Sequence, residues 1–379
     1  MTTSPPLLAP TTPTTATTPT TATTPAAAAA TPVPDPRFAH ILRALAARRP
    51  DRADIEAPFA PLERTAHRLH PGLAALRPAV GSTPLVPVPS RGGRGTVWLK
   101  AEAANLTGTV KARTAYALLC GAVARAGSGR VRLAEYSGGS LAVALAHMCG
   151  LLGLDLHLAV PHGAPERLVA ALRRDGARVT RAPEGTGFLG AMDEAARIAE
   201  DEGRRLLLQH SAPEAVAVHR ERTGAEIVAR LTGEGVRPHA LAASVGSAGT
   251  LVGTAQALRL RRPDCAAHAV FPAEAPYGDP HAPTAAPRMN GTGGLGHGLR
   301  QPLLAPYEDE FAFAEVGHRE ALDGMRLLHR TQRIAVSASA AGAWLTASRA
   351  LDEGPRGRHA VAVAASRGTV EEWTDAADH

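Results

Sequence analysis

Only two lysines occur in the 379-residue sequence, and both lie in the stretch KAEAANLTGTVKAR. Lys100 and Lys111 stand against 39 arginines, since lysine and arginine together number 41. The two residue types are interchangeable on a solvated surface. A guanidinium stays protonated, however, whereas a partly buried lysine can lose its proton and act as a nucleophile or base. Lys111 is therefore a candidate for chemistry that needs a neutral amine. At Lys100, chance retention is the alternative interpretation.

Four loops rich in small residues follow segments with the pattern of strands. In the first, Lys111 begins a helical segment, where the helix dipole disfavours a positive charge and helps to keep the amine neutral. In the third, backbone N–H groups at a helix start form a cradle for an anion, and the lack of GKS or GKT argues against a Walker-type nucleotide site. Any one loop is a weak signal, because such turns end strands in every α/β protein. The loops are NLTGTVKAR (105–113), EYSGGSLA (135–142), SVGSAGTLVG (244–253) and VSASAAGA (336–343).

The elements that must position these loops alternate between strands and helices. Amphipathic helical pieces occupy the chain from about residue 37 to residue 76. Strands that alternate with helices of 10 to 16 residues predict an α/β fold with mostly parallel sheets, and ligands bind such folds at the carboxyl ends of the strands. The predicted strands are 96–102, 130–136, 154–161, 177–183, 205–210, 239–246, 266–274 and 359–366. The predicted helices are 114–127, 140–153, 164–176, 188–203 and 250–263.

Composition excludes several classes of function. The net charge of +6 is spread along the chain, and no nucleic-acid-binding signature occurs, so we expect no nucleic-acid partner. Sixteen histidines without HExxH or a Cys/His cluster make a protein-bound metal an unfavourable interpretation. Three distant cysteines form no disulfide framework, which predicts a reducing, cytoplasmic compartment. GTGGLG (291–296) satisfies GxGxxG but lacks the preceding strand and the following helix of a dinucleotide fingerprint.

The first 36 residues differ in composition from the rest. Thr, Pro and Ala repeat there, and no charged residue precedes Asp35. This composition predicts a disordered tail, without the basic start and apolar core of a signal peptide. The most apolar stretch, 141–160, is interrupted by His147, Asp155 and His157, so a buried helix followed by a buried strand explains it better than a membrane span.

Taken together and in this order, the motifs resemble the fold type II pyridoxal-phosphate enzymes, in particular the cysteine synthase and cystathionine β-synthase family. GSTPLV (81–86) resembles the opening G-N-T-P-L of that family. KAEAANLTGTVKAR resembles K-x-E-x-x-N-P-x-G-S-x-K-D-R, and EYSGGSLAVALA aligns without gaps on E-x-T-S-G-N-T-G-x-A-L-A. VGSAGTLVG resembles V-G-T-G-G-T-L-x-G, and SASAAGA resembles G-I-S-S-G-A-A. The resemblance extends over roughly residues 78 to 373.

The resemblance implies pyridoxal 5′-phosphate as cofactor and a role for each matching residue. Lys111 would form the Schiff base, Ser140 would face the cofactor's phenolic oxygen, and Ser339 would face the pyridine nitrogen. The phosphate cradle would be Gly246, Ser247, Ala248, Gly249 and Thr250. The substrate would contact Ser137, Gly138, Gly139, Leu141, Gln209 and Gly294. Lys100 would have a structural role on a core strand.

Four departures from the family pattern affect this interpretation. Serine replaces the asparagine at Ser140, alanine replaces the aspartate at Ala112 and the middle cradle glycine at Ala248, and Gly138 replaces a serine. A Schiff base remains possible with these residues, but efficiency and substrate choice depend on them. They also leave open a catalytically silent relative that acts as a binding or regulatory protein.

The resemblance implies β-replacement on an O-activated serine, O-acetylserine or O-phosphoserine, through an aminoacrylate. The product would be a β-substituted alanine, such as cysteine or, as Leu141 suggests, a 2,3-diaminopropionate precursor. The alternative within the enzyme class is elimination, as in a serine/threonine dehydratase. The resemblance also implies a homodimer. Residues 37–111 and 221–379 would form the larger cofactor-binding domain, and 112–220 a smaller mobile one.

Overall fold

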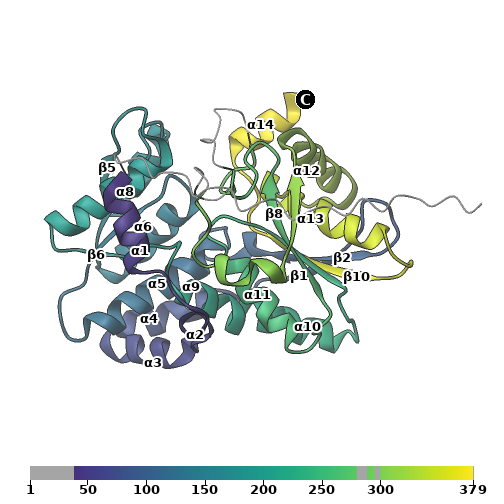
Figure 1. Cartoon of the computed structure of the whole chain (residues 1–379), viewed down its shortest axis with the longest axis horizontal. Helices are drawn as coiled ribbons and strands as arrows, with labels where there is room; N and C mark the ends of the chain where they lie inside the picture. Colours follow the sequence, from purple (N-terminus) through teal and green to yellow (C-terminus); the bar gives the residue numbers. More distant parts are fainter. Residues whose placement is uncertain (1–37, 280–287, 294, 296–298, 379) are drawn as a thin grey trace, which may run out of the picture. The chain divides into compact units, whose positions relative to one another are not determined.

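The structure of the chain is a computed structural model that describes residues 38–279, 288–293, 295 and 299–378. Within these ranges the chain forms two sheets whose strands alternate with helices (Figure 1). The α/β fold with mostly parallel sheets is therefore confirmed. The predicted tail, 1–36, lies outside the described residues, as does Gly294.

The first sheet has six strands in the order β1-β2-β10-β7-β8-β9. β1 is antiparallel to β2, and every other neighbouring pair is parallel. Its central strands are runs of small and branched apolar residues, as in a parallel sheet buried on both faces. The strands are β1 (Leu85–Pro89), β2 (Thr96–Ala101), β7 (Ala240–Ser244), β8 (Ala266–Pro272), β9 (Ala312–Val316) and β10 (His359–Ala364). The helices that alternate with them are α10 (Ala225–Gly233), α11 (Gly249–Arg259), α12 (His318–Gln332), α13 (Ala338–Asp352) and α14 (Val370–Asp378).

The second sheet has four parallel strands in the order β5-β4-β3-β6. The predicted strand 205–210 ends at Leu206, because Leu208 adopts a left-handed backbone with φ of 58° and turns the chain out of the sheet. This turn releases Gln209 from the sheet. The strands are β3 (Arg132–Tyr136), β4 (Asp155–Val160), β5 (Arg178–Arg181) and β6 (Arg205–Leu206). Helix α5 (Lys111–Ala126) precedes these strands, and α6 (Ser140–Leu152), α7 (Glu166–Arg174) and α8 (Gly187–Asp201) lie between them.

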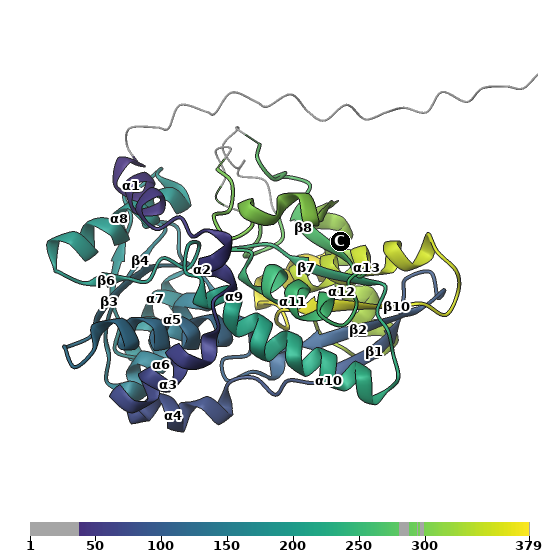
Figure 2. The ribbon, with the colours of Figure 1, turned by 60° about the horizontal axis from the view of Figure 1, so that its bottom comes forward.

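The N-terminal helices pack against elements of the four-stranded sheet (Figure 2). Phe38 and Ile41 join the apolar cluster under α8, and the ring of Phe59 meets that of Tyr116 edge-on. These helices are α1 (Ala39–Ala47), α2 (Arg52–Glu56), α3 (Phe59–Leu69) and α4 (Pro71–Leu76), and a further short helix, α9 (Glu214–Val218), packs on α5. The predicted domain boundaries stay a prediction.

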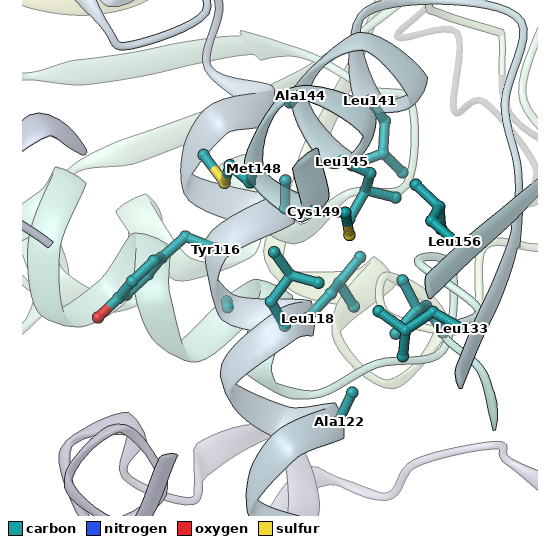
Figure 3. Close-up of a cluster of buried hydrophobic side chains, with 14 of the residues drawn as sticks. Tyr116, Leu118, Ala122, Leu133, Leu141, Ala144, Leu145, Met148, Cys149 and Leu156 are labelled. Carbon is teal, nitrogen blue, oxygen red and sulfur yellow. The ribbon is translucent and has the colours of Figure 1, made fainter. Parts of the chain in front are cut away.

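A continuous apolar core holds α5 and α6 together beside β3 and β4. Figure 3 shows Leu118 of α5, Leu145 and Met148 of α6, Leu133 of β3 and Leu156 of β4 in one cluster. Each is buried, and burying an aliphatic side chain contributes about 1.5 to 3 kcal/mol. This core fixes the first residues of α5 and α6, where Lys111 and Ser140 lie.

Candidate active site

The loop before α5 is anchored on both sides, which fixes where Lys111 begins the helix. The side-chain oxygen of Asn105 accepts hydrogen bonds from the N–H groups of Gly81 and Leu106, at 3.1 and 3.0 Å. The N–H of Val110 donates to the carbonyl of Ala365, just after β10. The hydroxyl of Thr109 accepts from the N–H of Lys111 at 3.0 Å. The lysine is thus tied to the carboxyl end of the six-stranded sheet.

The Lys111 side chain lies in an environment that favours a neutral amine. Burial lowers its pKa to about 8, against the smaller opposite effect of the Glu135 carboxylate. Its Nζ donates to Oε1 of Gln209 at 3.5 Å. At pH 7 roughly a tenth of such an amine is neutral, about 300 times the fraction for a lysine with the ordinary pKa. The amine is therefore available for bond formation.

The loop between β7 and α11 forms the predicted anion cradle. Ala248 occupies a left-handed conformation with φ of 74°, which costs a non-glycine residue about 1 kcal/mol. This turn leads into α11, whose first N–H groups have no partner within the helix and suit an anion. The hydroxyl of Thr250 lies 3.2 Å from Nε2 of His219, which fixes its side chain.

Gly246 brings the cradle next to the lysine. A Cβ built on this glycine would lie 4.0 Å from Nζ of Lys111 and 2.7 Å from the carbonyl oxygen of Gly291. Only a residue without a side chain fits here. The half-buried Lys111 amine and the glycine-lined loop with its backbone N–H groups therefore lie side by side. An amine suits an aldehyde and the N–H groups suit a phosphate, so these residues fit a phosphate-bearing aldehyde such as pyridoxal phosphate.

Replacing Gly246 with alanine tests this close approach. The added methyl group would displace the loop at Gly291, and overpacking of this kind costs about 1 to 3 kcal/mol. We expect the dissociation constant for pyridoxal phosphate to rise roughly tenfold to a hundredfold. Gly233→Ala is the matched control, since its Cβ would meet nothing within 4 Å. Equal cofactor affinities of the two variants, measured by fluorescence titration, would contradict the placement of the cradle.

The turn before α6 carries predicted substrate and cofactor residues whose side chains point in different directions. The Ser137 hydroxyl oxygen accepts hydrogen bonds from the N–H groups of Gly139 and Ala142, at 3.3 and 3.2 Å, and so satisfies both groups at the start of α6. Leu141 is 2% exposed and belongs to the core of Figure 3, so only its backbone is available to a ligand. Gly139 and Ser140 are exposed. The Cβ of any residue at Gly138 would meet Pro161 at 2.9 Å.

Ser339 lies in the first turn of α13 and is tied to the strand that leads to the cradle. Its carbonyl accepts from the hydroxyl of Ser244, the last residue of β7, at 2.6 Å. Its own hydroxyl lies 3.1 Å from that of Ser337, and both side chains are buried. The predicted residues that the structure describes therefore follow the carboxyl ends of β3, β6 and β7 or lie at the start of α5, α6, α11 and α13.

Sequence reasoning missed a buried polar layer beneath Lys111. Glu135 is fully buried; its Oε2 accepts from the N–H of Leu208 at 2.6 Å, and burial raises its pKa to about 8. The phenol of Tyr136 lies 2.5 Å from Nδ1 of His210, and the two rings stack. Burial, with the charge of Lys111, lowers the pKa of His210 to about 3, so this imidazole is neutral. A glutamate between Ala134 and Tyr136, within a strand expected to be buried, was the available signal for Glu135.

Lys100 is held in a buried ion network. Its Nζ lies 2.6 Å from Oε2 of Glu226 and donates to the carbonyl of Thr83, also at 2.6 Å. Arg113 bonds both Glu226 and the fully buried Glu102. The Glu226 carboxylate oxygen and the Thr83 carbonyl oxygen each accept one hydrogen bond from the compact ammonium group of Lys100. This arrangement agrees with the structural role expected of Lys100.

Two surface hollows lie elsewhere, toward the amino ends of the strands of the four-stranded sheet. Their linings share Gly153 and Leu154 and include none of the predicted site residues. Across the described part of the chain, every helix is too short or too polar to span a bilayer. In the same ranges, His, Cys, Asp and Glu side chains do not gather into a group of three that could hold a metal ion.

Comparison with known proteins decides the family. The family profile described as "Pyridoxal-phosphate dependent enzyme" matches residues 76–366, more than half of the chain. The chain belongs to this family. The predicted resemblance and the cofactor, pyridoxal phosphate, are therefore confirmed.

The named relatives are cysteine synthases. Cysteine synthase B of Escherichia coli (strain K12) is 31% identical over 193 residues, which cover 49% of this chain and 62% of that protein. The match thus spans about three fifths of that relative's length. The cysteine synthase of Staphylococcus aureus (strain Mu50) is 25% identical over 295 residues, 76% of this chain and 92% of that one.

Two solved structures share the fold. The O-ureido-L-serine synthase structure is 23% identical with a TM-score of 0.69, and the alignment covers 78% of this chain and 92% of that chain. Cysteine synthase from Entamoeba histolytica is 20% identical with a TM-score of 0.70, over 80% of this chain and 90% of that one. At these identities the likeness concerns the fold alone.

Proposed function

We propose that this protein catalyses pyridoxal-phosphate-dependent β-replacement on an O-activated serine, O-acetylserine or O-phosphoserine, to give a β-substituted alanine. Cysteine and a 2,3-diaminopropionate precursor are the candidate products. The observation that carries the proposal is the Lys111 amine, with its pKa lowered to about 8, beside the cradle at Gly246. Relatives named cysteine synthase support the reaction class.

In this proposal the backbone N–H groups bind the cofactor and the substrate, and Lys111 transfers the proton. The cofactor, when bound, supplies the electron sink that stabilises negative charge at Cα of the substrate. The N–H groups at the start of α11 would hold its phosphate, and those at the start of α6 would hold the substrate carboxylate. Lys111 would hold the cofactor aldehyde through Nζ and, as a free amine, would take the Cα proton of the substrate. Gln209 orients that amine from 3.5 Å.

A spectral titration of the purified holoenzyme tests the proposed reaction. O-acetylserine, O-phosphoserine, serine and cysteine are added in turn, and the visible band of the bound cofactor and the products are recorded. We expect an O-activated serine to change the band, and a new β-substituted alanine to form when a nucleophile follows. Release of ammonia and a keto acid in the presence of sulfide and amine nucleophiles would identify an eliminating enzyme instead. An unchanged band with every amino acid would mean a binding protein.

Ser140→Asn tests the turn that departs most from the family pattern. Asparagine adds an amide N–H on a longer arm, and one hydrogen bond to a charged oxygen contributes about 1.5 to 3 kcal/mol at best. We expect tighter cofactor binding, up to roughly a hundredfold. If the space above Ser140 admits a bulky nucleophile, the same variant will bind cofactor but release keto acid instead of completing replacement. Loss of covalent cofactor attachment in Ser140→Asn would mean that this turn does not face the cofactor.

A further inference from the structure

Two buried serine hydroxyls meet at the start of α13. The Oγ atoms of Ser337 and Ser339 lie 3.1 Å apart, and the side chains are 3% and 8% exposed. Ser337 is the N-cap of α13, and its Oγ accepts from the N–H of Ala340 at 3.2 Å. In the pattern G-I-S-S-G-A-A that aligns with this loop, the position of Ser337 is a glycine. The Ser337 hydroxyl is therefore a departure of this chain from that pattern.

The hydrogen-bonding capacity of a hydroxyl allows the pair two arrangements, which differ in which serine donates. Each hydroxyl has one proton to donate and two lone pairs that accept. The Ser337 oxygen accepts the N–H of Ala340 through one lone pair, and between the two hydroxyl oxygens, 3.1 Å apart, either one can donate to the other. When Ser337 donates to Ser339, the proton of Ser339 is directed away from Ser337 and is free for a ligand.

The surrounding groups hold the backbone that carries the two hydroxyls. The carbonyl of Ser339 accepts from the hydroxyl of Ser244, and the N–H of Ser337 donates to the carbonyl of Ser366. The carboxyl of Glu372 lies at the same helix start, where its oxygens accept the N–H groups of Ala338 and Thr369. The carboxyl is thus engaged by the backbone.

We propose that Ser337 is a positioning residue that turns the Ser339 hydroxyl into an obligate donor to the ring nitrogen of the cofactor. The inference rests on the proposed function and on the position of Ser339 facing that nitrogen, which the family resemblance implies. A ring nitrogen that accepts this hydrogen bond stays unprotonated. The ring then withdraws electrons less strongly, which favours expulsion of a β-leaving group over reactions that need a long-lived carbanion.

The test compares two cofactors by binding rather than by turnover. The apoprotein is titrated with pyridoxal phosphate and with the analogue in which carbon replaces the ring nitrogen. A hydrogen bond from Ser339 exists only with the first, so we expect the wild type to prefer pyridoxal phosphate by about fivefold to tenfold. The same ratio is measured for Ser337→Ala, Ser337→Thr and Ser339→Ala.

We expect the preference for pyridoxal phosphate over the analogue to fall to about one in Ser339→Ala. It should fall at least threefold in Ser337→Ala. In Ser337→Thr, which keeps the hydroxyl, it should stay near the wild-type value. A wild-type ratio in Ser337→Ala, with a ratio near one in Ser339→Ala, would leave Ser337 as a helix cap only and overturn the inference. A wild-type ratio in Ser339→Ala would overturn both the inference about Ser337 and the placement of Ser339 opposite the ring nitrogen. The proposed attachment of the cofactor to Lys111 would not be affected by that result. Thermal melting of each apoprotein checks folding, and Ser337→Gly replaces Ser337→Ala if the latter is unstable.

Discussion

Lys111→Arg abolishes covalent cofactor attachment and lowers turnover by roughly three orders of magnitude or more. Arginine keeps a positive charge but offers no neutral amine, so it can neither bond the cofactor aldehyde nor take the substrate proton. General acid–base catalysis alone contributes about 10²- to 10⁴-fold. Absorbance spectra and steady-state rates of the purified variant measure both effects.

The fold should survive this substitution. Among the described residues the Lys111 amine has one side-chain partner, Gln209 at 3.5 Å, so its removal leaves the packing of α5 intact. We expect the apoprotein melting temperature to change by no more than a few degrees. A variant that retains more than a tenth of the wild-type rate while folded would show that another group performs the proton transfer.

Glu102→Gln should be the most destabilising of the isosteric changes near the site. Glu102 is fully buried and accepts hydrogen bonds from Thr83, Asn105 and, through both oxygens, Arg113. Glutamine leaves the Arg113 guanidinium, 1% exposed, without half of its countercharge. Breaking a buried pair in this way costs about 3 to 5 kcal/mol, which lowers the melting temperature by roughly 6 to 10 °C for a domain of this size.

A matched control is available on the surface. Arg230 and Glu234 form an ion pair in which the side chains are 55% and 40% exposed, and such pairs contribute about 0 to 1 kcal/mol. Glu234→Gln should therefore change the melting temperature by about 2 °C or less. Because Arg113 lies two residues after Lys111, Glu102→Gln should also weaken cofactor binding, whereas Glu234→Gln should not. Equal melting temperatures of the two variants would contradict the role of the network.

The parts of the site that the sequence predicts are those encoded in short, local motifs. Lys111 and the cradle at 246–250 each lie within one turn between a strand and a helix, so residue type and spacing are sufficient to place them. At Leu141 the motif predicts a substrate contact, and the fold directs the side chain into the core, which leaves the backbone for that contact.

Tertiary contacts account for what sequence reasoning missed. Glu135 and His210 lie 75 residues apart in sequence and enter one buried layer only because Leu208 turns the chain out of the sheet. The same turn shortened the predicted strand 205–210. Domain mobility, the homodimer and the cytoplasmic location stay predictions.

The attachment of pyridoxal phosphate to Lys111 is the central claim, and reductive labelling tests it most directly. The holoenzyme is reduced with borohydride, digested and mapped by mass spectrometry. With two lysines in the sequence, the result is nearly binary. We predict one pyridoxyl group per chain on the peptide that contains Lys111, and none on Lys100, which is 1% exposed and bonded to Glu226. A label on Lys100, or no label in a protein that carries the cofactor, would contradict the account.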